Sequence, residues 1–163
     1  MLHQKNVVIL HANLCDMTSY KFNLNTMRIP KAELQYKIEA DFFEGKDYSP
    51  VHEGCVDVNV QILKKEGEFN VKIGMKGYVV TTCTRCMDDL NVDIESDDEV
   101  MVKLTKTPRE DDDYVYVVDT EGELDLEPLI YDFIILAIPE RHVHADGECN
   151  EEMESRLKQY LVN

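Results

Sequence analysis

Two cysteines separated by two residues form the arrangement with the clearest chemistry in this sequence of 163 residues. Cys83 and Cys86 could place two thiolates on a tight turn, where both can bind one tetrahedral metal ion. They supply half of the ligands that such an ion needs. The other half is expected from Cys149 together with His144 or His142, near the C-terminal end. The sequence therefore predicts a candidate structural zinc site with three sulfur ligands and one nitrogen ligand.

The remaining cysteines do not suggest a disulfide framework. The chain has five cysteines, an odd number, and its first ten residues hold only a short apolar run with no small-residue cleavage site, so we expect no signal peptide. The thiols are then reduced, and Cys15 and Cys55 are expected to be small buried residues. A thioredoxin-like redox pair is disfavoured, because strand spacing rather than a helix follows Cys86.

Net charge is distributed unevenly along the chain. Residues 1–82 carry 10 Lys and Arg against 10 Asp and Glu, whereas residues 83–163 carry 7 against 23, and this accounts for the net charge of −16. Because nucleic-acid binding depends on neutralising phosphates, the acidic half is not expected to bind RNA directly. It suits a basic protein partner, whose encounter it would accelerate, and it equally suits a solvated surface that maintains solubility.

Enzymatic motifs are missing from the sequence. There is no phosphate-binding glycine loop and no motif that would assemble a nucleophile with a histidine and an acid, so we expect no enzyme. Two acidic runs lack the spaced oxygen ligands of a calcium loop, and we expect charged surface there. Together with Arg85, these runs supply the candidate partner-binding residues Asp97, Asp98, Glu99, Glu110, Asp111, Asp112 and Asp113.

Strands are predicted through most of the first two thirds of the chain. Apolar residues alternate with polar ones over residues 34–42, 56–62, 69–73, 90–94 and 100–104, which is the period of a half-buried strand. The β-branched and aromatic residues 114–118 predict a further strand. The 34–42 pattern is the weakest, because Pro30 could also open a helix there. Breaks are expected at residues 45–50, at the glycine-containing hairpin 65–67 and at the loop 106–113.

Helices are predicted only near the C-terminal end. Residues 126–138 have helical apolar spacing, with Asp125 as the N-cap and Pro139 at the end, and residues 151–161 predict a second helix with a thin apolar face. The fold class is therefore α+β, a mostly antiparallel sheet or open barrel with one or two C-terminal helices. We expect one domain over residues 1–163, with strands at about 34–118 and the helical part at about 125–162. No apolar run is long enough to span a membrane, and a soluble, cytoplasmic protein is expected.

Three motifs in order resemble those of a known family. The Cys83-Thr84-Arg85-Cys86 turn is followed by Gly-Glu-Leu-Asp-Leu at residues 122–126, and then by Ile-Ile-Leu-Ala-Ile-Pro at residues 134–139 with His144 and Cys149 behind it. With the segment 41–43 and the strand after Gly54, they resemble the YceD-like family of large ribosomal RNA subunit accumulation proteins. The resemblance extends from about residue 34 to residue 149.

The resemblance implies a non-enzymatic role in ribosome biogenesis. The chain would support accumulation or processing of large-subunit ribosomal RNA, by binding a basic ribosomal protein or a large-subunit precursor. The family motifs carry over to Cys83, Arg85, Cys86, His144 and Cys149. A metal-stabilised RNA-binding module is the alternative, in which Lys64, Lys65, Lys72 and Lys76 of the neutral half lie near Phe69 and Tyr78.

Overall fold

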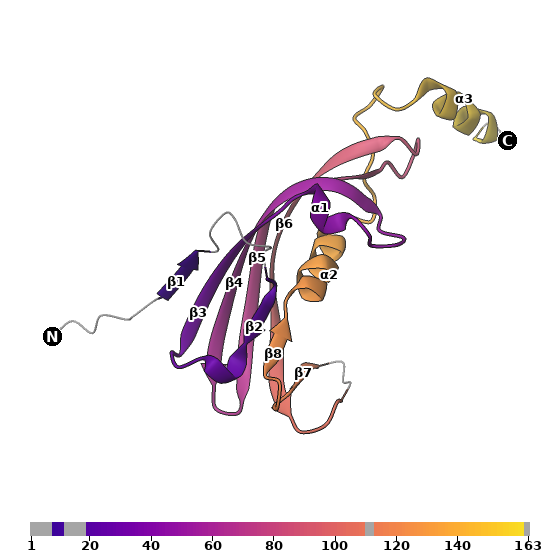
Figure 1. The fold of residues 1–163 in the computed structure, drawn as a ribbon. Coiled ribbons are helices and arrows are strands. Elements are labelled where there is room, and N and C mark those ends of the chain that lie inside the picture. Colours follow the sequence, from indigo (N-terminus) through magenta and orange to yellow (C-terminus); the bar gives the residue numbers. More distant parts are fainter. Residues whose placement is uncertain (1–7, 12–18, 110–112, 162–163) are drawn as a thin grey trace.

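The computed structural model describes residues 8–11, 19–109 and 113–161, and the backbone alone for 8–11. Strands dominate, and two of the helices come at the end of the chain (Figure 1). The elements are β1 (Val8–His11), β2 (Lys21–Asn23), a 3-10 helix (Leu24–Thr26), β3 (Lys31–Ile38), α1 (Ala40–Phe43), β4 (Val51–Lys65), β5 (Glu68–Thr82), β6 (Asp89–Thr105), β7 (Tyr114–Val118), β8 (Glu123–Asp125), α2 (Glu127–Ala137) and α3 (Glu151–Tyr160).

One six-stranded sheet, in the order β1-β3-β4-β5-β6-β7, forms the body of the molecule. Its four central strands pair antiparallel, and the two edge strands β1 and β7 pair parallel to their neighbours. β2 and β8 form a separate two-stranded antiparallel sheet. The order of the described strands is that of an open sheet, so the predicted α+β class with a mostly antiparallel sheet is confirmed.

The β4–β5 hairpin forms the centre of the sheet and follows the predicted alternation. Val56, Val60 and Ile62 are fully buried on β4, and their neighbours point to the other face, as the period of two requires. Gly67 closes the hairpin with a φ of +79°, a left-handed conformation that costs glycine little. The predicted turn is therefore confirmed.

The strand predicted over residues 34–42 ends early. β3 stops at Ile38 and residues 40–43 form the short helix α1. The Phe42 ring packs edge-on against Tyr20 and Phe43, with ring centroids 5.3 and 5.4 Å apart. A helical turn buries both phenylalanines on the same side, whereas a strand would send consecutive side chains to opposite faces. This packing explains why the alternating pattern was wrong beyond Ile38.

The two strand patterns predicted at residues 90–94 and 100–104 belong to one strand, β6. The long β5 pairs with it throughout, with Gly74 opposite Asp97 and Ile73 opposite Asp98. The acidic run therefore lies within a paired strand of the sheet and not in a loop. As a result, Asp97 and Glu99 project from one face and Asp98 from the other.

α2 lies beside β6 and completes the core (Figure 1). Ile130 and Ile134 are fully buried. The predicted N-cap, Asp125, is wrong by one residue, because the helix begins at Glu127 and its N-cap is Leu126. The Asp125 carboxylate still accepts a hydrogen bond of 3.0 Å from the Glu127 N–H in the first turn. α3 occupies residues 151–160, one residue short of the predicted helix. Within the described residues, no helix is long and apolar enough to cross a membrane.

Candidate metal centre

The Cys83–Cys86 pair lies on a tight turn between β5 and β6. The Cys83 N–H donates to the Asp88 carbonyl at 2.8 Å, and the Met87 N–H donates to the Cys83 carbonyl at 3.1 Å. Met87 adopts a left-handed φ of +69°. The turn buries both cysteines almost completely, so two thiol groups point inward where the two long strands meet.

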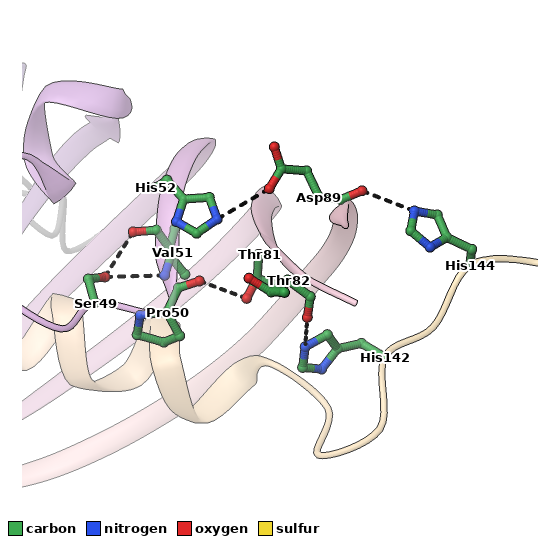
Figure 2. A network of polar contacts seen from close by, with 9 residues as sticks. All are labelled: Ser49, Pro50, Val51, His52, Thr81, Thr82, Asp89, His142 and His144. Atoms are coloured by element: carbon green, nitrogen blue, oxygen red, sulfur yellow. Dashed lines mark hydrogen bonds and ion pairs between the residues drawn. The ribbon is translucent and has the colours of Figure 1, made fainter. Parts of the chain in front are cut away.

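The chain after α2 is bound to this turn by backbone and side-chain hydrogen bonds. The Thr84 N–H and hydroxyl both donate to the His142 carbonyl, each at 2.9 Å. The His142 ring nitrogens lie 3.0 Å from the Thr82 carbonyl and 2.7 Å from the Pro139 carbonyl. Figure 2 shows His142 and His144 reaching from this segment to the ends of β5 and β6.

Four potential ligands converge at this point. One ligand atom each from Cys83, Cys86, His144 and Cys149 lies within 4.8 Å of all the others. The His144 Nδ1 atom is 3.3 Å from the Cys86 sulfur and 3.9 Å from the Cys149 sulfur. In a tetrahedral zinc site these ligand atoms would be about 3.5 to 3.8 Å apart. The structure therefore brings together two sequence segments whose contact the sequence did not show.

His144, and not His142, is the histidine of the cluster. Its Nε2 atom lies 3.0 Å from the Asp89 carbonyl, so an Nε2–H would donate there and leave the Nδ1 lone pair directed at the sulfurs. A backbone carbonyl that orients the second nitrogen is the usual support of a metal-binding histidine. Both His142 nitrogens face carbonyl oxygens instead, at Pro139 and Thr82, so neither is directed at the sulfur atoms.

Burial and hydrogen bonds shift the pKa values of the clustered side chains in different directions. Burial raises the pKa of the Cys83 thiol, but hydrogen bonds from the Cys86 and Arg85 N–H groups outweigh it and lower that pKa to about 6. The hydrogen bond to Cys83 raises the pKa of His144. Burial raises the pKa of Cys149 to about 11. At neutral pH one thiolate is thus already present to bind a cation.

The lowered pKa of Cys83 does not indicate a redox pair. A reactive cysteine must be accessible to its substrate, whereas Cys83 has no exposed surface and Cys86 is only 2% exposed. Buried thiols beside a histidine are instead the donor set of a closed structural site. Cys55, expected to be buried, is partly exposed on β4 and is not part of the cluster, while Cys15 lies outside the described residues.

The three clustered cysteines have little apolar packing to hold them. They form a small cluster separate from the main core, contacted by Leu90, Val143 and Met153. Such a cluster buries too little apolar surface to fix four side chains. The donor chemistry and the geometry therefore fit a metal ion as its organising centre.

The candidate partner-binding residues that the structure describes do not lie together. Arg85 forms an ion pair of 3.2 Å with Glu154 of α3, rather than with a neighbouring aspartate. Glu99 is paired with Lys72 and accepts a hydrogen bond from Asn70, and Ser96 donates to Asp98. Asp113 is exposed, and Glu110, Asp111 and Asp112 lie outside the described residues.

Three of the four lysines that the RNA-binding alternative uses contact other groups of the protein. Lys72 and Lys76 face Glu99 and Glu95 across the β5–β6 pairing, and Lys64 donates to the Met27 carbonyl. Cross-strand acids neutralise two of these charges, and so this sheet face presents mixed charge rather than a basic surface.

Comparison with known proteins identifies the family. The sequence model of the large ribosomal RNA subunit accumulation protein YceD matches residues 71–161, more than half of the chain. The chain belongs to the YceD family. The match includes α3 and the four residues Cys83, Cys86, His144 and Cys149, which we call the Cys-His cluster. It begins at residue 71, whereas the resemblance suggested a start at about residue 34. No curated protein and no solved structure matches the chain.

Family membership implies a role in the accumulation of large-subunit ribosomal RNA. Sequence motifs found the cysteines of the cluster but missed the groups that hold it together. The Thr84 hydroxyl and the Asp89 carbonyl act through the folded backbone, and their residue types carry no signal of this function.

Proposed function

We propose that this YceD-family chain acts as a non-enzymatic assembly factor, which binds a basic ribosomal protein or a large-subunit precursor through its acidic half. The observation that supports this most directly is the excess of acidic residues in the region that the family model matches. Residues 71–161 hold 23 acidic residues and 9 Lys and Arg, together with the whole Cys-His cluster. Such a surface attracts cationic proteins over a range of about 8 Å at physiological salt and repels the phosphates of bare RNA.

Sedimentation with ribosomal precursors tests this function. Tagged protein in a cell extract should travel with large-subunit precursors on a sucrose gradient, and the association should weaken as salt is raised, since screening shortens the reach of exposed charges. Absence from those fractions at every salt concentration would overturn the proposal. Binding of naked ribosomal RNA at micromolar concentration or tighter would favour the RNA-binding alternative.

The Cys-His cluster binds one structural zinc ion in this proposal. Three buried thiolates and one imidazole suit zinc, and no position is left for substrate, as in closed structural sites. The ion would connect the β5–β6 turn to the segment before α3. Its role would be to hold the C-terminal part of the chain on the sheet.

Titration of chelator-treated protein with Co²⁺ tests the donor set. Cobalt bound by thiolates has charge-transfer absorption that scales with the number of sulfur ligands. One equivalent per chain should produce a three-thiolate spectrum, which zinc then abolishes by displacing the cobalt. A spectrum without thiolate charge transfer would overturn the proposed site.

A further inference from the structure

α2 exposes more apolar surface than a helix on a sheet usually does. Apart from Glu127 and Asp132 its residues are apolar on every side, and helices of that composition are normally buried all round. Only Ile130 and Ile134 are fully buried, whereas Leu136 is 76% exposed.

A pocket of about 290 Å³ lies at the C-terminal end of this helix. Ile135, Ile138 and Pro139 form one wall, and Pro50 and Thr81 form the other. The volume can take one large aliphatic side chain, and the lining is mostly apolar, as in many recognition pockets. Leu136 does not line the pocket but is the next residue after Ile135, and its exposed side chain lies on the same last turn of α2.

Hydrogen bonds hold part of the pocket lining in place, and Figure 2 shows those that join Thr81 to Pro50 and His142 to Thr82. The Thr81 hydroxyl donates to the Pro50 carbonyl at 2.7 Å, and the His142 ring lies between the Thr82 and Pro139 carbonyls. Because His142 also accepts from Thr84 of the cysteine turn, the pocket is connected to the Cys-His cluster. A pre-formed wall lowers the entropic cost of binding.

The charged residues nearest the pocket in sequence are two acids and one cation. Glu140 lines the pocket, Asp132 is exposed on the preceding helix, and Arg141 follows Glu140. Within the described part of the chain, neither Asp132, one turn before Leu136, nor Glu140, on the pocket rim, has an ion pair. A partner with positive charges beside an apolar side chain would complement this surface.

We infer that the pocket at the end of α2, together with Leu136, Asp132 and Glu140, binds a basic protein segment by one large aliphatic side chain flanked by Lys or Arg. This inference rests on the proposed function and names the surface that carries it. The aliphatic side chain fills the pocket and supplies affinity, while the flanking cations face the two unpaired carboxylates. A second copy of the chain fits poorly, because the same acids would face each other.

Short peptides and NMR test the surface directly. The probe is a Lys-Lys-Leu-Lys-Lys peptide with blocked ends, added to isotope-labelled full chain loaded with zinc. Amide shifts should cluster at Thr82, Ile135, Leu136, Ile138 and His142. Replacing the central leucine of the peptide with alanine should weaken binding at least about tenfold, because the pocket then remains unfilled.

Matched variants separate apolar contact from charge. Leu136→Ser should weaken leucine-peptide binding several-fold. Leu161→Ser removes a leucine that is 81% exposed at the C-terminal end of α3, and it should leave binding unchanged. Asp132→Asn with Glu140→Gln should weaken binding and reduce its salt dependence.

Two outcomes would overturn the inference. Equal binding of the leucine and alanine peptides, with shifts spread over the acidic surface, would show attraction by charge alone and would leave the proposed assembly function intact. A concentration-dependent dimer that Leu136→Ser abolishes would assign this face to a second copy of the chain. Failure of the assembly function itself appears separately, as absence from precursor fractions in the gradient experiment.

Discussion

Arg85 is oriented by a contact within the chain. Its guanidinium lies 3.2 Å from Glu154, and both side chains are partly exposed. Pairs of this kind contribute about 0 to 1 kcal/mol, so we expect Arg85→Ala to lower the free energy of unfolding by less than about 1 kcal/mol in urea titrations. Co-sedimentation with precursors should be unchanged. A loss of co-sedimentation at unchanged stability would instead place Arg85 in the partner interface.

Tyr20 and Tyr36 determine an alkaline limit of stability. Their rings lie 5.1 Å apart, and burial, the largest cause in both cases, raises each pKa from 10 to about 12. Below pH 10 both the folded and the unfolded chain keep these protons. Between pH 10 and 12 the unfolded chain releases them first, so stability must fall as pH rises.

Tyrosinate absorbance and urea midpoints across this pH range measure the effect. Tyr36→Phe should make the unfolding free energy fall less steeply between pH 10 and 12. Tyr48→Phe is the control, because Tyr48 is fully exposed. An equal slope in the parent and the Tyr36 variant would contradict the predicted shift.

At the scale of elements, α3 depends on the cluster rather than on the core. None of its residues is buried, and ten residues are too few for a stable isolated helix in water. Asn150 caps it, Met153 packs on the cysteines, and Arg85 pairs with Glu154. All of these contacts lie at the Cys-His cluster.

Removing metal should therefore unfold α3 before the sheet. With a chelator, hydrogen exchange at residues 151–160 should accelerate strongly, while the amides of β4 and β5 stay protected by the main core. Far-ultraviolet circular dichroism should show a small loss of helix only. Exchange in α3 that is the same with and without chelator would contradict a metal-dependent helix.

The spacing of apolar residues predicted the long strands and helices, because in these elements the face that is buried repeats regularly along the sequence. The alternation of β4 and the helical spacing of α2 follow directly from which face meets the core. β2 and β8 could not be predicted this way, since three residues hold no period and their pairing joins Phe22 to Leu124 across the chain. α1 was missed because aromatic packing overrode the alternation around Phe42.

At the scale of the whole molecule, the two halves of the predicted zinc site meet because the fold brings the segment after α2 back to the turn that carries Cys83 and Cys86. α2 runs beside β6, and the segment that follows it brings residues 142–149 to the turn between β5 and β6 (Figure 1). Spacing alone left His142 and His144 as equal candidates, because their roles depend on which carbonyls face each ring. The acidic run at Asp97, Asp98 and Glu99 was likewise predicted as one charged surface. The pleat of β6 instead directs Asp98 to one face of the sheet and its two neighbours to the other, which composition does not reveal.

The metal content of purified protein tests the central claim most directly. Protein prepared without chelator should contain about one zinc per chain by elemental analysis. Cys86→Ser and Cys149→Ser should each lose it, because they remove ligands from the two separate segments, and Cys55→Ser should keep it. A folded parent without metal, or zinc retained in both ligand variants, would contradict a zinc ion that joins the β5–β6 turn to the C-terminal segment.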